Sequence, residues 1–383
     1  MIVFAVPDFD PIVGGTSRQT RLQAEALANR GHEVMVVTRR LDHALARSER
    51  VNGLSVVRVG PPGRSTVAEK RALLSLARWF RSHRRTIGVV QIVMWPDAIV
   101  AAAAAGLRDR SAVLWAIDGE ITHTLAGGSS PLRRARSTAS RRLLRPAEHV
   151  TLTDRMAAEF AHAGFPVRNT VIPVPVDRAH FRPATTEERR AARTSLGLDG
   201  DAFVVVYVGH LQRRKAVDRL VAAVDELHLR IPKLRLLLVG GARGAADDTE
   251  DALRVEVTER GLTEVVTFCG IASDPRQYLW AADVLALPSQ REGMPNSLLE
   301  ALAVGIPAIA PASAGGDLVL DVETGLVPPS NEPQALAAAI EKLHGDSAAR
   351  LRMGAAARAR SGRYDVEVIA DAYERVYARM VKR

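Results

Sequence analysis

Short apolar runs alternate with amphipathic segments along the first half of this chain, and this alternation constrains the fold more than any other feature. Residues 2–6 form a β-branched run, residues 16–30 carry apolar side chains at helical spacing, and residues 34–38 form the next run. Further buried strands are predicted at residues 89–94, 113–117 and 150–153. Strands that alternate with helices favour a parallel, doubly wound sheet.

A proline-rich break divides the chain into two such series. The stretch that starts at Val171 holds three prolines and then becomes charged, which is typical of a linker near residues 175–195. A second series follows, with strands predicted at residues 203–209, 234–241, 265–268, 284–287 and 307–310 and helices at residues 217–229 and 296–304. We therefore predict an α/β fold with two doubly wound, Rossmann-like domains, residues 1–180 and 195–363, facing each other across a cleft.

Composition excludes several classes of protein. The fractions of hydrophobic (47%) and charged (25%) residues are those of a soluble globular protein, and no apolar run reaches the roughly 20 residues of a membrane-spanning helix. No secretory signal is recognisable, and the single cysteine, Cys269, rules out an internal disulfide framework. These features predict a cytoplasmic protein.

The net charge of +9 leaves three interpretations open. Nucleic acid is disfavoured as a partner, because aromatic residues make up only 4% and do not alternate with basic ones. An anionic small substrate, an anionic membrane surface and an ordinary solvated surface all remain compatible with the charge.

The segment SQREGMPNSLLEALAVGIP, residues 289–307, is the strongest motif. A strand enters a loop with Gly293 and Pro295, and a helix follows from Asn296. Backbone N–H groups and the partial positive charge at such a helix start suit a phosphate. Glu292 and Glu300 lie on either side with seven residues between them, and each carboxylate can accept two hydrogen bonds from a sugar diol. The segment predicts a site for a diphosphate that links two sugars.

A second motif, VVVYVGHLQRRKAVDRL, spans residues 204–220. The strand ends at Gly209, and four basic side chains follow it: His210, Arg213, Arg214 and Lys215. Such cations can neutralise the charge that develops on a leaving diphosphate, and arginine adds a bidentate fork. Taken alone, the segment is better described as a solvated basic loop.

Two weaker candidates lie in the N-terminal half. Gly14 and Gly15 precede a helix and could cradle a phosphate, but they do not form the Gly-x-Gly-x-x-Gly fingerprint of nicotinamide enzymes. Asp118 follows a predicted strand and either faces the cleft or caps a helix. No histidine or cysteine cluster has metal-ligand spacing, so we expect neither a metal nor a cofactor.

Together these residues resemble glycosyltransferase family 4, a retaining family with the GT-B fold. The Glu-x7-Glu segment EGMPNSLLEALAVGIP carries the most specific part of the resemblance. Four further segments follow the family in order: GGTSRQTRLQAEALANRGHEVMVVT, YVGHLQRRKAVDRL, TFCGIASDPRQYLWAADVLALPS and GGDLVLDVETGLVPP. The resemblance covers nearly the whole chain.

The resemblance implies roles for individual positions. Glu300 would hold the ribose, Glu292 the hydroxyls of the donor sugar, and Lys215 the diphosphate. Backbone groups would complete the donor site: Met294, Asn296 and Ser297 around the sugar and diphosphate, Gly270 and Ile271 at the base, and Gly15 over the diphosphate. The last helix, residues 364–383, would return to the N-terminal domain.

Two positions that bear on catalysis depart from the family. His210 stands where arginine is frequent, so either Arg213 or Arg214 supplies the missing charge or His210 itself acts as a weaker partner. Asp118 stands where histidine is frequent near the acceptor. The resemblance implies a retaining transferase that moves a hexose-type sugar from a UDP- or GDP-linked donor to an acceptor hydroxyl without a metal. A sugar-nucleotide epimerase, a sugar phosphorylase or a non-catalytic nucleotide- or glycan-binding homologue is the alternative.

The acceptor is a small molecule or a lipid-linked one in this interpretation, and the N-terminal domain would bind it. Contact with a membrane is suggested by two arginine-rich segments, which comprise Arg71, Arg78, Arg81, Arg84 and Arg85 in one and Arg133, Arg134, Arg136, Arg141, Arg142 and Arg145 in the other. Leu73, Leu74, Trp79 and Phe80 accompany the first segment. Such segments could dock on anionic lipid.

Overall fold

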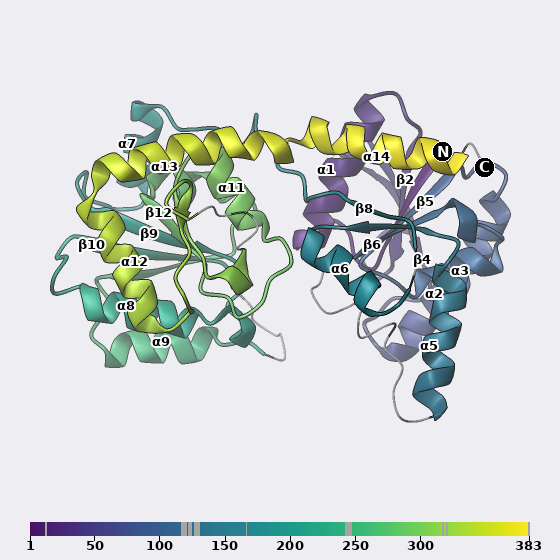
Figure 1. The fold of residues 1–383 in the computed structure, drawn as a ribbon, viewed down its shortest axis with the longest axis horizontal. Helices are drawn as coiled ribbons and strands as arrows, with labels where there is room; N and C mark the ends of the chain where they lie inside the picture. Colours follow the sequence, from purple (N-terminus) through teal and green to yellow (C-terminus); the bar gives the residue numbers. More distant parts are fainter. Residues whose placement is uncertain are drawn as a thin grey trace. The chain divides into compact units, whose positions relative to one another are not determined.

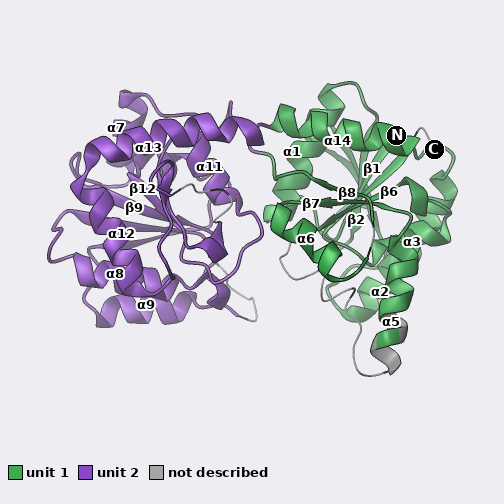
Figure 2. Ribbon diagram, in the orientation of Figure 1, with its two compact units in different colours: residues 1–175, 366–383 green, residues 176–365 purple. Residues whose placement is uncertain are grey.

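The computed structural model describes residues 1–11, 14–115, 121, 125, 131–165, 167–241, 247–315, 318 and 321–381, without the side chains of residues 131–133, 135 and 136. The chain forms two compact units (Figure 2). Unit 1 comprises residues 1–175 and 366–383, and unit 2 comprises residues 176–365. The sequence prediction had placed the first boundary at residue 180, five residues later.

Unit 1 is built on an eight-stranded sheet with the order β3-β4-β2-β1-β5-β6-β7-β8. Its strands are β1 (Ile2–Val6), β2 (Val34–Arg39), β3 (Ser48–Val51), β4 (Leu54–Val59), β5 (Val89–Val93), β6 (Ser111–Trp115), β7 (Glu148–Thr151) and β8 (Asn169–Val171). Every pairing is parallel except that of β3 with β4. The central strands β1, β5 and β6 are buried along their whole length, which explains their continuous apolar sequence.

The helices of unit 1 include one from the end of the chain. They are α1 (Gly15–Asn29), α2 (Thr66–His83), α3 (Ala98–Ala104), α5 (Pro131–Leu144), α6 (Asp154–His162) and α14 (Val366–Val381). Helix α14 runs beside α1 (Figure 1), where the Arg30 guanidinium contacts Glu367, Asp371 and Glu374. The Tyr377 hydroxyl also donates a 3.1 Å hydrogen bond to Gln91 of β5.

Unit 2 contains a six-stranded, wholly parallel sheet with the order β11-β10-β9-β12-β13-β14. Its strands are β9 (Phe203–Val208), β10 (Leu234–Val239), β11 (Val266–Gly270), β12 (Val284–Ala286), β13 (Ala308–Ile309) and β14 (Gly325–Leu326). Its helices are α7 (Thr186–Ser195), α8 (Val217–Leu227), α9 (Glu250–Glu259), α10 (Arg276–Ala281), α11 (Asn296–Val304), α12 (Pro333–Gly345) and α13 (Ser347–Arg360). Counted within the unit, this is the Rossmann order 3-2-1-4-5-6. The predicted fold class is confirmed.

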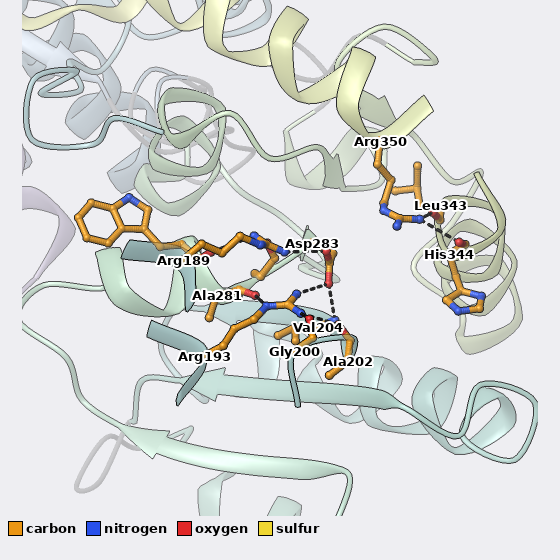
Figure 3. Close-up of polar contacts among 12 residues, drawn as sticks. Arg189, Arg193, Gly200, Ala202, Val204, Ala281, Asp283, Leu343, His344 and Arg350 are labelled. Atoms are coloured by element: carbon orange, nitrogen blue, oxygen red, sulfur yellow. Dashed lines mark hydrogen bonds and ion pairs between the residues drawn. The ribbon is translucent and has the colours of Figure 1, made fainter. Parts of the chain in front are cut away.

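Helix α7 was missed by the sequence prediction, which assigned its residues to a linker. Thr185 caps the helix, and the guanidinium groups of Arg189 and Arg193 share the Asp283 carboxylate (Figure 3). The same two side chains donate to carbonyl oxygens at the end of α10. This helix has no apolar stripe, because buried arginine replaces the aliphatic side chains that helical periodicity would reveal.

No helix among the described residues is long and apolar enough to span a bilayer.

Candidate functional site

The strand order of unit 2 defines where a ligand would bind. From β9 the chain continues to β10 on one side, and from β12 it continues to β13 on the other. The loops that follow β9 and β12 therefore meet at the point where the order reverses, which is the usual ligand site of such sheets. They touch directly, since the Gln290 N–H donates a 3.0 Å hydrogen bond to the Arg214 carbonyl.

The Lys215 and Glu292 side chains form an ion pair at this point. The Lys215 ammonium donates a short hydrogen bond to Oε1 of Glu292. Arg214 Nη1 lies 3.6 Å from Oε2 of the same carboxylate. The Lys215 and Glu292 side chains are 11% and 8% exposed, whereas Arg214 is 51% exposed. The structure thus brings together three of the predicted site residues and buries two of them.

Two opposing effects act on the positive charge of Lys215. Burial lowers the pKa of the Lys215 ammonium, and the neighbouring Arg214 adds to this effect. The charge of Glu292 and its hydrogen bond raise that pKa and partly offset the burial. A desolvated cation attracts an anion more strongly than an exposed one does, because its charge is less screened than in water.

The environment of His210 disfavours a positive charge on its ring. Desolvation lowers the pKa of His210, and so do the positive charges of Lys215 and Arg214, even though the residue as a whole is exposed. The lowered pKa reduces the positive charge that the imidazole carries. Its backbone carbonyl accepts a 2.7 Å hydrogen bond from the hydroxyl of the buried Tyr207, a contact that the sequence did not suggest.

Glycine is required at the end of β9. A Cβ atom at Gly209 would lie 2.7 Å from the Tyr207 hydroxyl oxygen, so any side chain there would displace the tyrosine. Arg213 starts the short 3₁₀ turn Arg213–Lys215 and donates its N–H to the Asp247 carbonyl at 3.1 Å. Ala216 follows the turn in a left-handed conformation with φ 49°. That conformation is strained for any residue other than glycine.

Helix α11 begins at Asn296, as predicted, with Pro295 as its N-cap. The helix is buried almost throughout, and Glu300 in its second turn is only 4% exposed. Before the helix, Gly293 is half-buried and Met294 is buried. The Glu292 N–H donates to the Ser313 carbonyl at 3.0 Å, which anchors the carboxylate to a segment that the sequence prediction did not connect with the site.

The carboxyl ends of β10 and β11 carry the positions predicted near a base. Gly270 ends β11 with φ 71°, and its carbonyl accepts the Gly240 N–H at 2.8 Å. Ile271 follows with 70% of its surface exposed. A large apolar side chain in this position offers a flat surface to a planar ring.

In unit 1, Gly14 is the N-cap of α1 and Gly15 its first residue. Gly14 has an extended backbone (φ −164°), and a Cβ atom there would contact nothing within 4 Å. The fold of unit 1 by itself does not require glycine at this position. Asp118 lies outside the described residues. Among the residues that the model describes, no group of His, Cys, Asp and Glu side chains could hold a metal ion.

Two family models match the chain almost end to end. The model described as glycosyl transferases group 1 matches residues 188–360, and the glycosyl transferase 4-like domain matches residues 14–175. The chain belongs to the family 4-like glycosyltransferases of the GT-B fold. The predicted resemblance is thereby confirmed.

Relatives and solved structures agree with this family. D-inositol 3-phosphate glycosyltransferases from Kineococcus radiotolerans and Nocardia farcinica are 34% and 35% identical over 67% and 60% of this chain. The matched regions span only 63% and 52% of those two proteins. Sucrose-phosphate synthase from Thermosynechococcus elongatus has a TM-score of 0.82 at 25% identity over 99% of both chains. The fold of Anabaena HepE, solved with UDP-glucose, is also similar, with a TM-score of 0.77 at 18% identity over 99% of both chains.

Proposed function

We propose that this family member transfers a hexose-type sugar from a nucleoside-diphosphate sugar to an acceptor hydroxyl, with the donor bound in unit 2. The buried Lys215–Glu292 pair at the reversal of strand order carries this proposal. Such a pair is costly to bury, so a protein has reason to retain it where its charges act on a ligand.

The donor would separate this ion pair. In the proposed complex Lys215 turns to the diphosphate together with the start of α11, and Glu292 turns to hydroxyls of the transferred sugar. Glu300 accepts hydrogen bonds from the ribose, and Ile271 covers the base. Both ions therefore keep a charged or hydrogen-bonding partner when the donor enters, which avoids a desolvation penalty.

The proposed reaction retains the anomeric configuration. The bond between the anomeric carbon and the diphosphate oxygen breaks, and the acceptor oxygen bonds to that carbon on the same face. The acceptor proton passes to the leaving diphosphate, so no separate general base is needed. Lys215, Arg214 and the start of α11 stabilise the leaving charge, and turnover does not depend on a divalent ion.

The donor is UDP- or GDP-linked in this proposal. HepE and a trehalose-6-phosphate protein of the same fold were solved with UDP-glucose and UDP-2-fluoro glucose, which makes uridine donors the first to test. The curated relatives are named for D-inositol 3-phosphate, so phosphorylated polyols head the acceptor panel. We assign the acceptor to unit 1, as the family resemblance implies.

A membrane-bound acceptor also fits part of unit 1. On α2, Leu74 is 61% exposed beside several exposed arginines. Phe80, by contrast, is fully buried and cannot contact lipid in the folded unit. Arg141 donates to the Leu125 and Ala163 carbonyls and would have to give up these hydrogen bonds to bind a lipid phosphate. Co-sedimentation with anionic vesicles at low salt tests whether the exposed face of α2 around Leu74 binds lipid.

A donor panel read by thermal unfolding tests the proposal, because a ligand that binds only the folded state raises the melting temperature. One nucleoside-diphosphate hexose should raise it, and Glu300→Gln should weaken that donor about tenfold to a hundredfold, the range for a lost charged hydrogen bond. Product analysis then separates a transferase, which needs an acceptor, from an epimerase, which does not. A panel in which no nucleotide sugar binds would refute the proposal.

A further inference from the structure

The turn before α12 contacts the loop that carries Glu292. Asn331 lies in this turn, between β14 and α12, and its amide Nδ2 donates a 2.9 Å hydrogen bond to the Pro288 carbonyl. Pro288 is the second residue after the end of β12. The side chain of Asn331, which is 43 residues away in the sequence, therefore holds the start of this loop at Pro288.

The other end of the same amide is held by α8. Oδ1 of Asn331 accepts a hydrogen bond from Nη1 of Arg219, which lies in the first turn of that helix. Arg219 also contacts Glu332, the N-cap of α12, at 2.6 Å. Asn331 thus uses both its donor and its acceptor, and it connects α8 to the loop after β12.

Alternate residues of this loop are tied to different segments. The Pro288 carbonyl binds Asn331, the Gln290 N–H binds the Arg214 carbonyl, and the Glu292 N–H binds the Ser313 carbonyl. Arg214 and Arg219 lie on either side of Lys215 in one short stretch of chain. Residues 214–219, which include Lys215, therefore contact the loop with Glu292 in two ways. Arg214 contacts it directly, and Arg219 contacts it through Asn331.

We propose that Asn331, oriented by Arg219, is a positioning residue that holds residues 288–292 so that Glu292 faces Lys215. Neither side chain touches that ion pair. The consequence for turnover rests on the proposed function, whereas the consequence for the loop itself does not.

The substitution Asn331→Asp isolates the contact. An aspartate still accepts from Arg219, now as an ion pair, but it offers no N–H to Pro288 and turns an oxygen toward the carbonyl. The fold of α8 and α12 is therefore retained while the loop loses its hydrogen bond. Hydrogen exchange of the ligand-free protein, read on peptides that cover residues 287–295 and 333–345, reports on each part separately.

We expect exchange of the loop peptide to rise about threefold to tenfold, the range that one neutral hydrogen bond supports, with α12 unchanged. Turnover should fall within the same range, and donor affinity should fall with it. Two control variants should behave as wild type. Glu332→Gln removes a partner of Arg219 that does not contact the loop, and Arg230→Ala breaks the Arg230–Glu341 ion pair.

Two results would overturn the inference. One is a loop peptide in Asn331→Asp that exchanges at the wild-type rate. The other is a rise in exchange spread evenly over unit 2, which would make Asn331 a general stabilising residue. A wild-type protein that binds none of the UDP or GDP sugars would refute the proposed function alone, because the exchange measurement needs no ligand.

Discussion

Two largely buried ionisable side chains, one in each unit, are held by opposite kinds of partner. In unit 1, His149 of β7 is fully buried among Trp115, Phe160 and Phe165. Its Nδ1 is 3.0 Å from the Trp115 indole N–H, which donates to it, and its Nε2 is 3.1 Å from the Leu144 carbonyl. Burial lowers the pKa of His149 to about 4, so the ring is neutral at neutral pH.

In unit 2 the same desolvation acts on Lys215, but the partner differs. A neutral indole and a carbonyl satisfy the hydrogen bonds of His149, whereas a carboxylate opposes the loss of charge on Lys215. Burial alone therefore does not determine the charge state, and the partner decides it. A neutral buried group suits packing, and a buried ion pair suits a site that must bind an anion.

The largest expected effect comes from removing the cation in unit 2. Lys215→Ala should lower turnover at least about tenfold and up to about a thousandfold, because a preorganised positive charge no longer faces the leaving diphosphate. Steady-state kinetics with a saturating donor would measure it. Lys233→Ala is the matched control, since Lys233 pairs with Asp201 on the exposed surface. If the two variants had equal turnover, the buried Lys215 would be no more important for catalysis than the exposed Lys233.

A smaller effect is expected for unit 1 in acid. The pKa of His149 is about 4 in the folded state against an ordinary 6.5, so between these values only the unfolded chain binds the proton. Stability is therefore complete above pH 6.5 and falls as the pH decreases, by roughly 2 kcal/mol at pH 5 and 3 kcal/mol at pH 4. Urea unfolding across this range, compared with His149→Phe, measures the contribution. The variant should be less stable than wild type at pH 7, but its free energy of unfolding should decrease less as the pH falls. An equal decrease in both proteins would show that His149 does not cause the loss of stability in acid.

The smallest effect concerns the backbone beside Lys215. Ala216 is left-handed although it is not glycine, whereas Gly14 before α1 is extended although it is glycine. Ala216→Gly should relieve this strain and stabilise the protein by about 0.5–1 kcal/mol. Ala222→Gly, within the same helix α8, should instead destabilise it by about 1 kcal/mol. Thermal unfolding of both variants measures whether each substitution raises or lowers stability. A loss of stability in Ala216→Gly would show that the turn is not strained.

Much of the fold follows from local patterns. Continuous apolar runs predicted β1, β5 and β9, and the loop with Gly293 and Pro295 predicted the start of α11, because each signal lies within a few residues of the element it defines. Helix α7 and strands β3, β4, β8 and β14 escaped prediction. Helix α7 buries arginine, β3 is an exposed, charged edge strand, and β8 and β14 are only two or three residues long. Among the site residues, Lys215 and Glu292 could be placed near strand ends from the sequence, because each follows a strand and precedes a helix. Tyr207, Ser313 and Asn331 could not, because nothing near them in the chain indicates their partners.

The sequence by itself determined two α/β series, a break between them, and the residue types that a diphosphate site requires. Those properties depend on side-chain period and on turn residues, which act over one element. Only the tertiary structure decided that β12 lies beside β9, which brings Glu292 to Lys215 across 77 residues. It also decided that desolvation lowers the pKa of His210 and that Asn331 reaches Pro288. Hydrogen bonds and desolvation depend on which distant segments the strand order brings together, and no local pattern specifies that order.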